Sequence, residues 1–281
     1  MVEWLIEPLA YSFIVRGLVA AILTGVACAV LSAFVVWRGM AFVGDAIAHA
    51  ILPGIVVAFI AGISLFIGAL AMAIVVAAGI GWLSRRGEVK EDTAIGVVFT
   101  GFFALGILML SKVTSYQDLT HILFGDILGV GQDDLWIMLA ILAVVLGAVF
   151  VFYKELLVTS FDPGHSVAIG LSPDLVRYGL LLLIALTVVA AIQVVGVVLV
   201  LALLITPAAA ASLLVKRLPA IIGLGVVFAV ISALVGFYAS YYANVASGAA
   251  VVLSLTVIFV GAYLINLLKQ RNIGRRMPNG Q

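Results

Sequence analysis

Charged side chains are scarce in this chain, and their scarcity excludes a water-soluble domain. They make up 10% of the 281 residues, whereas 65% of the residues are hydrophobic. A soluble domain carries about 25% charged residues, so this composition is typical of an integral membrane protein. The formal net charge is only +1, which leaves no basic surface for nucleic acid. The single cysteine, Cys28, lies in an apolar run and cannot form a disulfide within the chain.

The motifs of several enzyme classes are also missing. The sequence contains no G-x-x-x-x-G-K-[ST] phosphate loop, so it has no ATP site of that kind. It contains neither the H-E-x-x-H helix of metalloproteases nor the G-x-S-x-G elbow of hydrolases. We therefore expect no enzymatic activity and no permanently bound cofactor. The sequence offers instead a scaffold of many helices with few polar groups inside the lipid bilayer.

Long apolar segments predict the fold class. A helix needs about 20 apolar residues to cross the hydrocarbon core of a bilayer. Nine segments fit this requirement, at 11–36, 41–60, 63–83, 93–112, 135–153, 176–193, 197–214, 219–239 and 248–268. The weakest boundaries lie at "WRGMAFVG" and around Gln193 to Gly196, so the expected count is eight to ten. The sequence thus predicts an all-α polytopic membrane protein in which residues 1–281 form a single transmembrane domain.

The distribution of basic residues predicts the orientation of the spans. If the N-terminus lies outside the cell, cytoplasmic loops hold twelve of the fourteen lysines and arginines, and only Arg16 and Lys112 lie outside. The cytoplasmic loops of membrane proteins carry such an excess of positive charge. We therefore expect the N-terminus outside and the C-terminus in the cytoplasm.

The stretch "VGDAIAHAILPG" places an acid and an imidazole in an otherwise apolar span. A charged group inside the bilayer costs about 3 kcal/mol on insertion scales and usually faces a partner or a pathway. Asp45 and His49 are four residues apart and share one face of a helix. They form either a structural hydrogen bond or a pair that transiently ligates a cation, and this donor set suits zinc, manganese or iron. Pro53 and Gly54 are expected to kink or end the helix just past the pair.

Two other features carry weaker signals. His121 lies in the predicted outer loop beside Asp118, where it could help to receive a metal, although a solvated loop histidine is the commoner case. Thr206 precedes Pro207 in a later span, and its hydroxyl is expected to satisfy backbone groups that the proline frees.

The predicted cytoplasmic loop 160–175 contains a short helix signal. Asp162 precedes Pro163 and can cap a helix that runs to about Ile169, where Gly170 would stop it. Such a segment is either an ordinary connector or a docking helix for a soluble partner. A transporter without a phosphate loop needs an external energy source, and a separate ATPase docking here would supply it.

Five stretches, in order along the chain, resemble the permease subunits of bacterial zinc and manganese ATP-binding-cassette importers. They are "FVVWRGMAFVGDAIAHAILPG", "EDTAIGVVFTGFFALGI", "DLTHILFGDILGV", "LLVTSFDPGHSVAIGL" and "VVGVVLVLALLITPAAAASLL". The resemblance covers almost the whole chain. It implies a type II importer fold in the bacterial plasma membrane and alternating-access transport of zinc or manganese, with iron as a third candidate.

The resemblance also implies partners and residue roles. Two copies of the permease would form a homodimer with two ATPase subunits that bind ATP, and an extracytoplasmic metal-binding protein would deliver the ion. Asp45 and His49 occupy the positions of a metal-contacting pair. The ATPases would dock on the helix at about 162–170. Its matching residues are Asp162, Pro163, Ala168 and Gly170.

Two alternatives stay open on the residues alone. In a proton-coupled secondary metal transporter, Asp45 and His49 would relay protons and no ATPase would be needed. In a membrane protein without transport activity, the pair would be structural.

Overall fold

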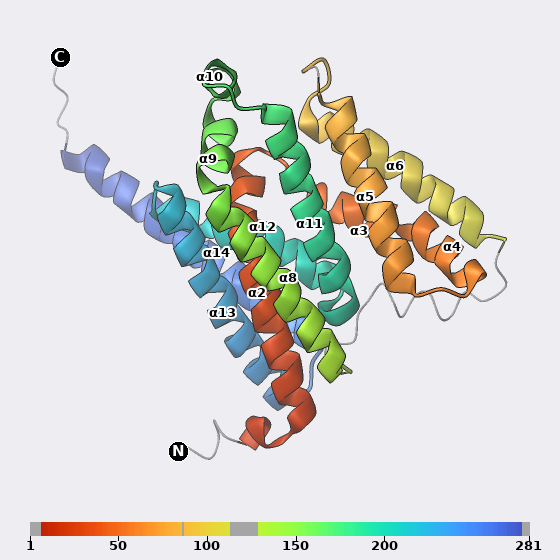
Figure 1. The fold of residues 1–281 in the computed structure, drawn as a ribbon. Coiled ribbons are helices and arrows are strands. Elements are labelled where there is room, and N and C mark those ends of the chain that lie inside the picture. The colour runs from red at the N-terminus through yellow and green to blue at the C-terminus, as the bar shows by residue number, and fades with distance from the viewer. Residues whose placement is uncertain (1–6, 86, 113–128, 277–281) are drawn as a thin grey trace.

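The computed structural model describes residues 7–85, 87–112 and 129–276, and every regular element within them is a helix (Figure 1). The helices are η1 (Glu7–Ala10), α2 (Ser12–Trp37), α3 (Val43–Ala50), α4 (Leu52–Ala61), α5 (Leu65–Leu83), α6 (Glu91–Leu110), α8 (Gln132–Val151), α9 (Tyr153–Phe161), α10 (Pro163–Ala168), α11 (Pro173–Val195), α12 (Val197–Leu214), α13 (Leu218–Ala243) and α14 (Ser247–Arg276). In this part of the chain, nine helices or helix pairs are long and apolar enough to cross a membrane. The predicted all-α fold with nine spans is confirmed.

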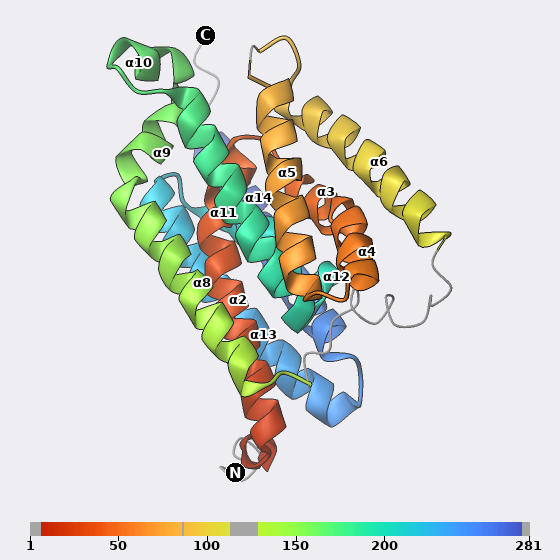
Figure 2. The ribbon, with the colours of Figure 1, turned by 45° about the vertical axis from the view of Figure 1, so that its right-hand side comes forward.

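Helix α2 lies at the centre of the bundle. It packs against α8, α11, α12 and α13, and most of its length is buried. Helices α3 to α6 lie together on one side of α11, which contacts α5 (Figures 1 and 2). Successive spans alternate in direction, so α10 and the N-terminus lie at opposite ends of the molecule (Figure 1). The turns after α2 and α5 therefore gather at the same end as α9 and α10.

The second span is broken into the two half-helices α3 and α4, as expected from its proline. Pro53 lacks the backbone N–H that would bond to the carbonyl of His49, four residues earlier. The first half-helix ends at Ala50, and Pro53 lies in the first turn of the second. Gly54 and Gly68 hold α4 against α5, because a Cβ on either residue would collide with the carbonyl oxygen of the other. The break thus leaves α3 as a separate, firmly supported element.

Both weak boundaries of the sequence prediction separate distinct helices. Gly196 joins α11 to α12 with a φ of +82°, a backbone conformation that residues with a Cβ rarely adopt. Gly39, with a φ of +71°, lies in the turn between α2 and α3. Neither segment is a single continuous helix, so the nine-span count stands for the described residues.

A buried serine on α2 serves the backbone of α12 around Pro207. The hydroxyl of Ser32 donates to the carbonyl oxygen of Ile205 at 3.2 Å and accepts from the N–H of Ala208 at 3.3 Å. The sequence predicted that the hydroxyl of Thr206 would bond to backbone groups near Pro207. The side-chain hydroxyl that contacts the backbone there belongs to Ser32 of another helix. Its source was invisible locally because Ser32 and Ala208 are 176 positions apart.

Replacing Ser32 with alanine should therefore destabilise the folded chain. Ser32 is fully buried, and a typical intramolecular hydrogen bond contributes about 0.5–1.5 kcal/mol to stability. Thermal unfolding in detergent micelles should show a lower midpoint for Ser32→Ala than for the wild type. Ser254→Ala is the matched control, because the Ser254 hydroxyl bonds only to Ala250 of its own helix at 2.8 Å. Equal midpoints for the two variants would contradict the proposed role of Ser32.

Candidate functional site

Helix α3 is an eight-residue half-span that carries Asp45 and His49. Its other residues are buried, and it packs on α5, α6, α11 and α12. Asp45 lies in its first turn and His49 in its last turn. A helix dipole is complementary to an acid at its N-terminus, so the carboxylate of Asp45 suits its position.

The side chains of Asp45 and His49 contact one another. Nδ1 of His49 lies 3.2 Å from Oδ1 of Asp45 and 3.1 Å from the backbone carbonyl oxygen of the same residue. Both neighbours of Nδ1 are acceptors, so a neutral imidazole must carry its proton there. The lone pair then resides on Nε2, the ring nitrogen that a metal ion can approach. The residues lie together as their spacing predicts, and this contact fits both the structural and the metal-binding interpretation.

Two aromatic rings of α6 hold the imidazole in place. The ring of His49 meets those of Phe99 and Phe103 edge-on, with centroids 6.1 Å and 5.5 Å away. The side chains of Asp45 and His49 are each 33% exposed, although the rest of α3 is buried. The pair is therefore partly open to the surface of the single chain, and we call α3 and α6, which pack on one another, its two walls.

The described residues of one chain bring too few donors together for a complete metal site. Within the described residues, no group of three or more histidine, cysteine, aspartate or glutamate side chains is placed to hold a metal ion. Transition metals in proteins take four to six ligands as a rule. Asp45 and His49 thus offer two adjacent donors, fewer than a complete coordination shell needs. His121 and Asp118, the weaker metal candidates, lie outside the described residues.

The short helix signal in loop 160–175 corresponds to α10. Oδ1 of Asp162 accepts from the backbone N–H of His165 at 2.8 Å, which caps the helix, and Pro163 is its first residue. The helix ends at Ala168, and Gly170 follows with a φ of +83°. The surrounding loop is shorter than its predicted bounds, because α9 extends to residue 161 and α11 begins at 173.

Apolar side chains project outwards around α10. Val167 is 62% exposed and Ile169 is 54% exposed, and Phe161, at the end of α9, is also exposed. We call these three residues the α10 patch. Figure 1 places α10 at the end of the molecule farthest from the N-terminus, so the patch lies beyond the apolar spans. The α10 patch is uncovered in the single chain, and this exposure is compatible with a contact to another protein.

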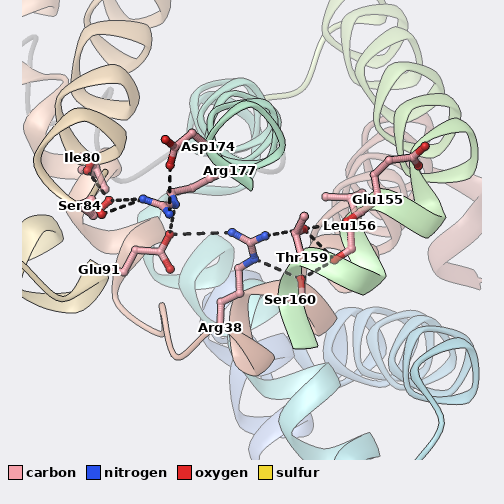
Figure 3. Close-up of polar contacts among 10 residues, drawn as sticks. All are labelled: Arg38, Ile80, Ser84, Glu91, Glu155, Leu156, Thr159, Ser160, Asp174 and Arg177. Carbon is pink, nitrogen blue, oxygen red and sulfur yellow. Dashed lines mark hydrogen bonds and ion pairs between the residues drawn. The ribbon is translucent and has the colours of Figure 1, made fainter. Parts of the chain in front are cut away.

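A network of charges that the sequence did not reveal borders the same cavity as Pro163 of α10. Figure 3 shows its contacts. Oε1 of Glu91 lies 3.2 Å from Nε of Arg177 and 3.9 Å from Nη1 of Arg38. Arg177 also lies 3.4 Å from Asp174, and Asp174 lies 3.2 Å from the exposed Arg85. The network joins the ends of α2, α5, α6 and α11.

Hydrogen bonds extend this network to α9 and α5. Arg38 donates to Oγ1 of Thr159 at 3.0 Å and to Oγ of Ser160 at 3.2 Å, and Arg177 donates to the carbonyl oxygen of Ser84 at 2.9 Å. Burial lowers the pKa of the Arg38 guanidinium, and the carboxylate of Glu91 opposes that shift. In the sequence these arginines carried only an orientation signal. The only hint of a partner was the position of Glu91 at the start of the apolar segment that forms α6.

Comparisons with known proteins agree with this architecture. A model of the ABC 3 transport family matches residues 10–266. The "Manganese transport system membrane protein MntC" of Listeria monocytogenes is 46% identical over 254 residues, covering 90% of this chain and 91% of the relative. The "Probable iron transport system membrane protein" of Haemophilus influenzae is 41% identical over 272 residues, covering 96% and 100%. The solved structure "PsaBC from Streptococcus pneumoniae in complex with Fab" has a TM-score of 0.80 and 37% identity, covering 93% of this chain and 95% of that chain.

Proposed function

The chain belongs to the ABC 3 transport family, as its motifs indicated, and we propose that it conducts manganese ions into a bacterial cell. As a member of this family it is a multi-pass permease, a transport component rather than an enzyme. The observation that carries the proposal is the Asp45–His49 pair. It presents an imidazole Nε2 and a carboxylate on the one-third-exposed face of an otherwise buried half-helix.

The choice of manganese rests on relatives and on donor chemistry. A relative that is 46% identical is described as a manganese transport protein. Carboxylate with imidazole suits manganese, iron and zinc alike, so the pair alone does not select among them. Iron is the second candidate, because another relative is described as a probable iron transport protein. Zinc stays a prediction from the sequence motifs.

A second copy of the chain completes the metal path in this proposal. Each copy contributes one Asp–His pair, so two copies related by a two-fold axis contribute four donors. The exposure of both side chains supports this arrangement, since a buried pair could not meet a facing copy. Two ATPase subunits dock on α10 of the two permeases, and an extracytoplasmic binding protein delivers the ion at the opposite end.

The proposed cycle is alternating access. The N-terminus lies outside and α10 lies in the cytoplasm, as the basic loops favour. Hydrolysis of ATP in the partner subunits rocks the two permeases, and the ion passes between them along the face that holds Asp45 and His49. The pair binds the ion transiently, because an incomplete coordination shell binds it weakly enough to release it.

Uptake into proteoliposomes tests this function. The vesicles hold this chain, its ATPase subunits and its metal-loaded binding protein, and they receive radiolabelled manganese, iron or zinc in separate runs. We expect uptake of manganese that requires ATP and persists when the proton gradient is collapsed. Uptake that needs no ATP and follows the proton gradient would replace the importer with a secondary transporter. Faster uptake of iron or zinc would reassign the cargo.

A further inference from the structure

The charge network borders the same cavity as Pro163 of α10. Two of its residues adjoin the walls of the metal pair, because Arg38 precedes α3 and Glu91 begins α6. Its central part consists of Arg38, Glu91 and Arg177, which we call the ionic node (Figure 3). The node takes no part in binding the ion. Its members are far apart in the sequence, so their meeting is a property of the fold.

Arg38 connects α9 to the helix that carries the pair. It directly follows α2, lies in the turn before α3, and its side chain is only 8% exposed. Its hydrogen bonds run to Thr159 and Ser160 in the last turn of α9, and α9 leads directly into α10. The rings of Trp37 and Phe161 meet edge-on at 4.1 Å and strengthen the same junction. Arg38 thus ties the last turn of α9 to the turn that precedes α3.

Glu91 connects α11 to the opposite wall. It is the first residue of α6, the helix whose Phe99 and Phe103 pack on His49. Its partner at 3.2 Å is Arg177 in the second turn of α11, and α11 follows α10 in the chain. This ion pair thus ties the start of α11 to the start of α6.

The contact between Arg38 and Glu91 is the longer of the two ion pairs in the node. Arg38 and Glu91 are 3.9 Å apart, longer than the 3.2 Å between Arg177 and Glu91. Oε1 of Glu91 is buried yet accepts no hydrogen bond from any described residue. Electrostatic attraction to the two arginines therefore holds Oε1 of Glu91. Such a contact can lengthen or re-form without breaking a directed hydrogen bond.

We propose that Glu91 is a positioning residue which, through Arg38 and Arg177, transmits movement of α10 to both walls of the Asp45–His49 pair. This inference rests on the proposed import function. When an ATPase shifts α10, α9 moves Arg38 and α3, while α11 moves Arg177, Glu91 and α6. The two walls then separate or close together, so that access to the pair follows the state of the ATPase.

The variant Glu91→Gln tests this role in the reconstituted complex. Glutamine keeps the shape but removes the charge, so Arg38 and Arg177 are left facing one another without an acid between them. We expect ATP hydrolysis to stay near the wild-type rate, while manganese taken up per ATP falls about tenfold, a typical strength of coupling between sites. Glu91→Asp restores the charge with a shorter reach and should recover part of the ratio.

Asp92→Asn is the matched control. Asp92 is the neighbouring acid in the same first turn of α6, but it is exposed and outside the node. It should transport manganese per ATP as the wild type does. Thr159→Val with Ser160→Ala is a second, uncharged test, because it detaches Arg38 from α9 and leaves the node intact. It should also lower the manganese taken up per ATP. If Glu91→Gln fails to assemble, this double variant tests the inference in its place.

Unchanged manganese per ATP in both Glu91→Gln and the double variant Thr159→Val with Ser160→Ala would overturn the inference. Equal losses of hydrolysis and uptake would do the same, since they would assign the node to assembly alone. Failure of the proposed function has a different signature, because the wild-type complex itself would then accumulate no manganese while hydrolysing ATP. That result would remove the inference together with the function on which it rests.

Discussion

Alanine at Asp45 or at His49 should lower metal uptake by at least about a hundredfold, because loss of even the outer partner of a metal-bound histidine costs about 10–100-fold. The folded chain should tolerate both changes. The two side chains are each 33% exposed, and alanine favours helix at every interior position. The buried face of α3 is untouched. The complex should therefore still reach the membrane and bind its ATPase subunits.

Uptake of radiolabelled manganese, with copurification of the ATPase as the assembly check, measures this effect. Thr256→Val is a suitable control, because Thr256 is an exposed polar group of α14 whose hydroxyl bonds only within its own helix, at 2.9 Å to Val252. It should transport normally. Near-normal uptake in both alanine variants would mean that Asp45 and His49 form a packing contact, and the path would have to be sought elsewhere.

Aspartate at both Val167 and Ile169 should weaken ATPase binding by at least about a hundredfold, since residues that dominate an interface cost 2 kcal/mol or more each. These side chains are 62% and 54% exposed in the single chain, so the change does not disturb its core. In the proposed complex they are covered, and a buried unpaired carboxylate is strongly unfavourable. Metal uptake should fall to background.

Copurification of the ATPase subunits and the rate of ATP hydrolysis measure this second effect. Lys216→Asp places the same new charge at the same end of the molecule, outside the α10 patch. Lys216 is exposed, and its ammonium group donates only to Ser212 of the preceding helix, at 3.1 Å. This variant should bind the ATPase normally. If the Val167 and Ile169 double variant stimulates hydrolysis as the wild type does, then the ATPases dock elsewhere.

The features that could be predicted are those whose causes lie close together in the chain. A span follows from a run of apolar residues, and the break after Ala50 follows from Pro53 and the backbone bond it cannot donate. The pairing of Asp45 with His49 follows from a four-residue spacing, and the cap of α10 from Asp162 beside Pro163. Each prediction needed only helix geometry within a few residues.

The features that escaped prediction join distant parts of the chain. Ser32 supports the backbone around Pro207 from another helix, 176 positions from Ala208, and Arg38 reaches Thr159 across 121 positions. A hydroxyl or a guanidinium can pair with many partners, and the sequence does not order them in space. Local reasoning therefore expected the Thr206 hydroxyl to bond to the backbone near Pro207. It used Arg38 only as one of the basic residues that orient the spans, with no partner predicted for it.

The sequence by itself determined the membrane class, the nine spans, the family and the two candidate sites, because apolar length, helix periodicity and capping are local properties of the backbone. Tertiary structure alone decided which face of α3 is open, which rings enclose His49, and how Glu91 lies between two arginines. Those arrangements depend on helices packing side by side, and packing selects partners by shape and charge in three dimensions rather than by their order in the chain.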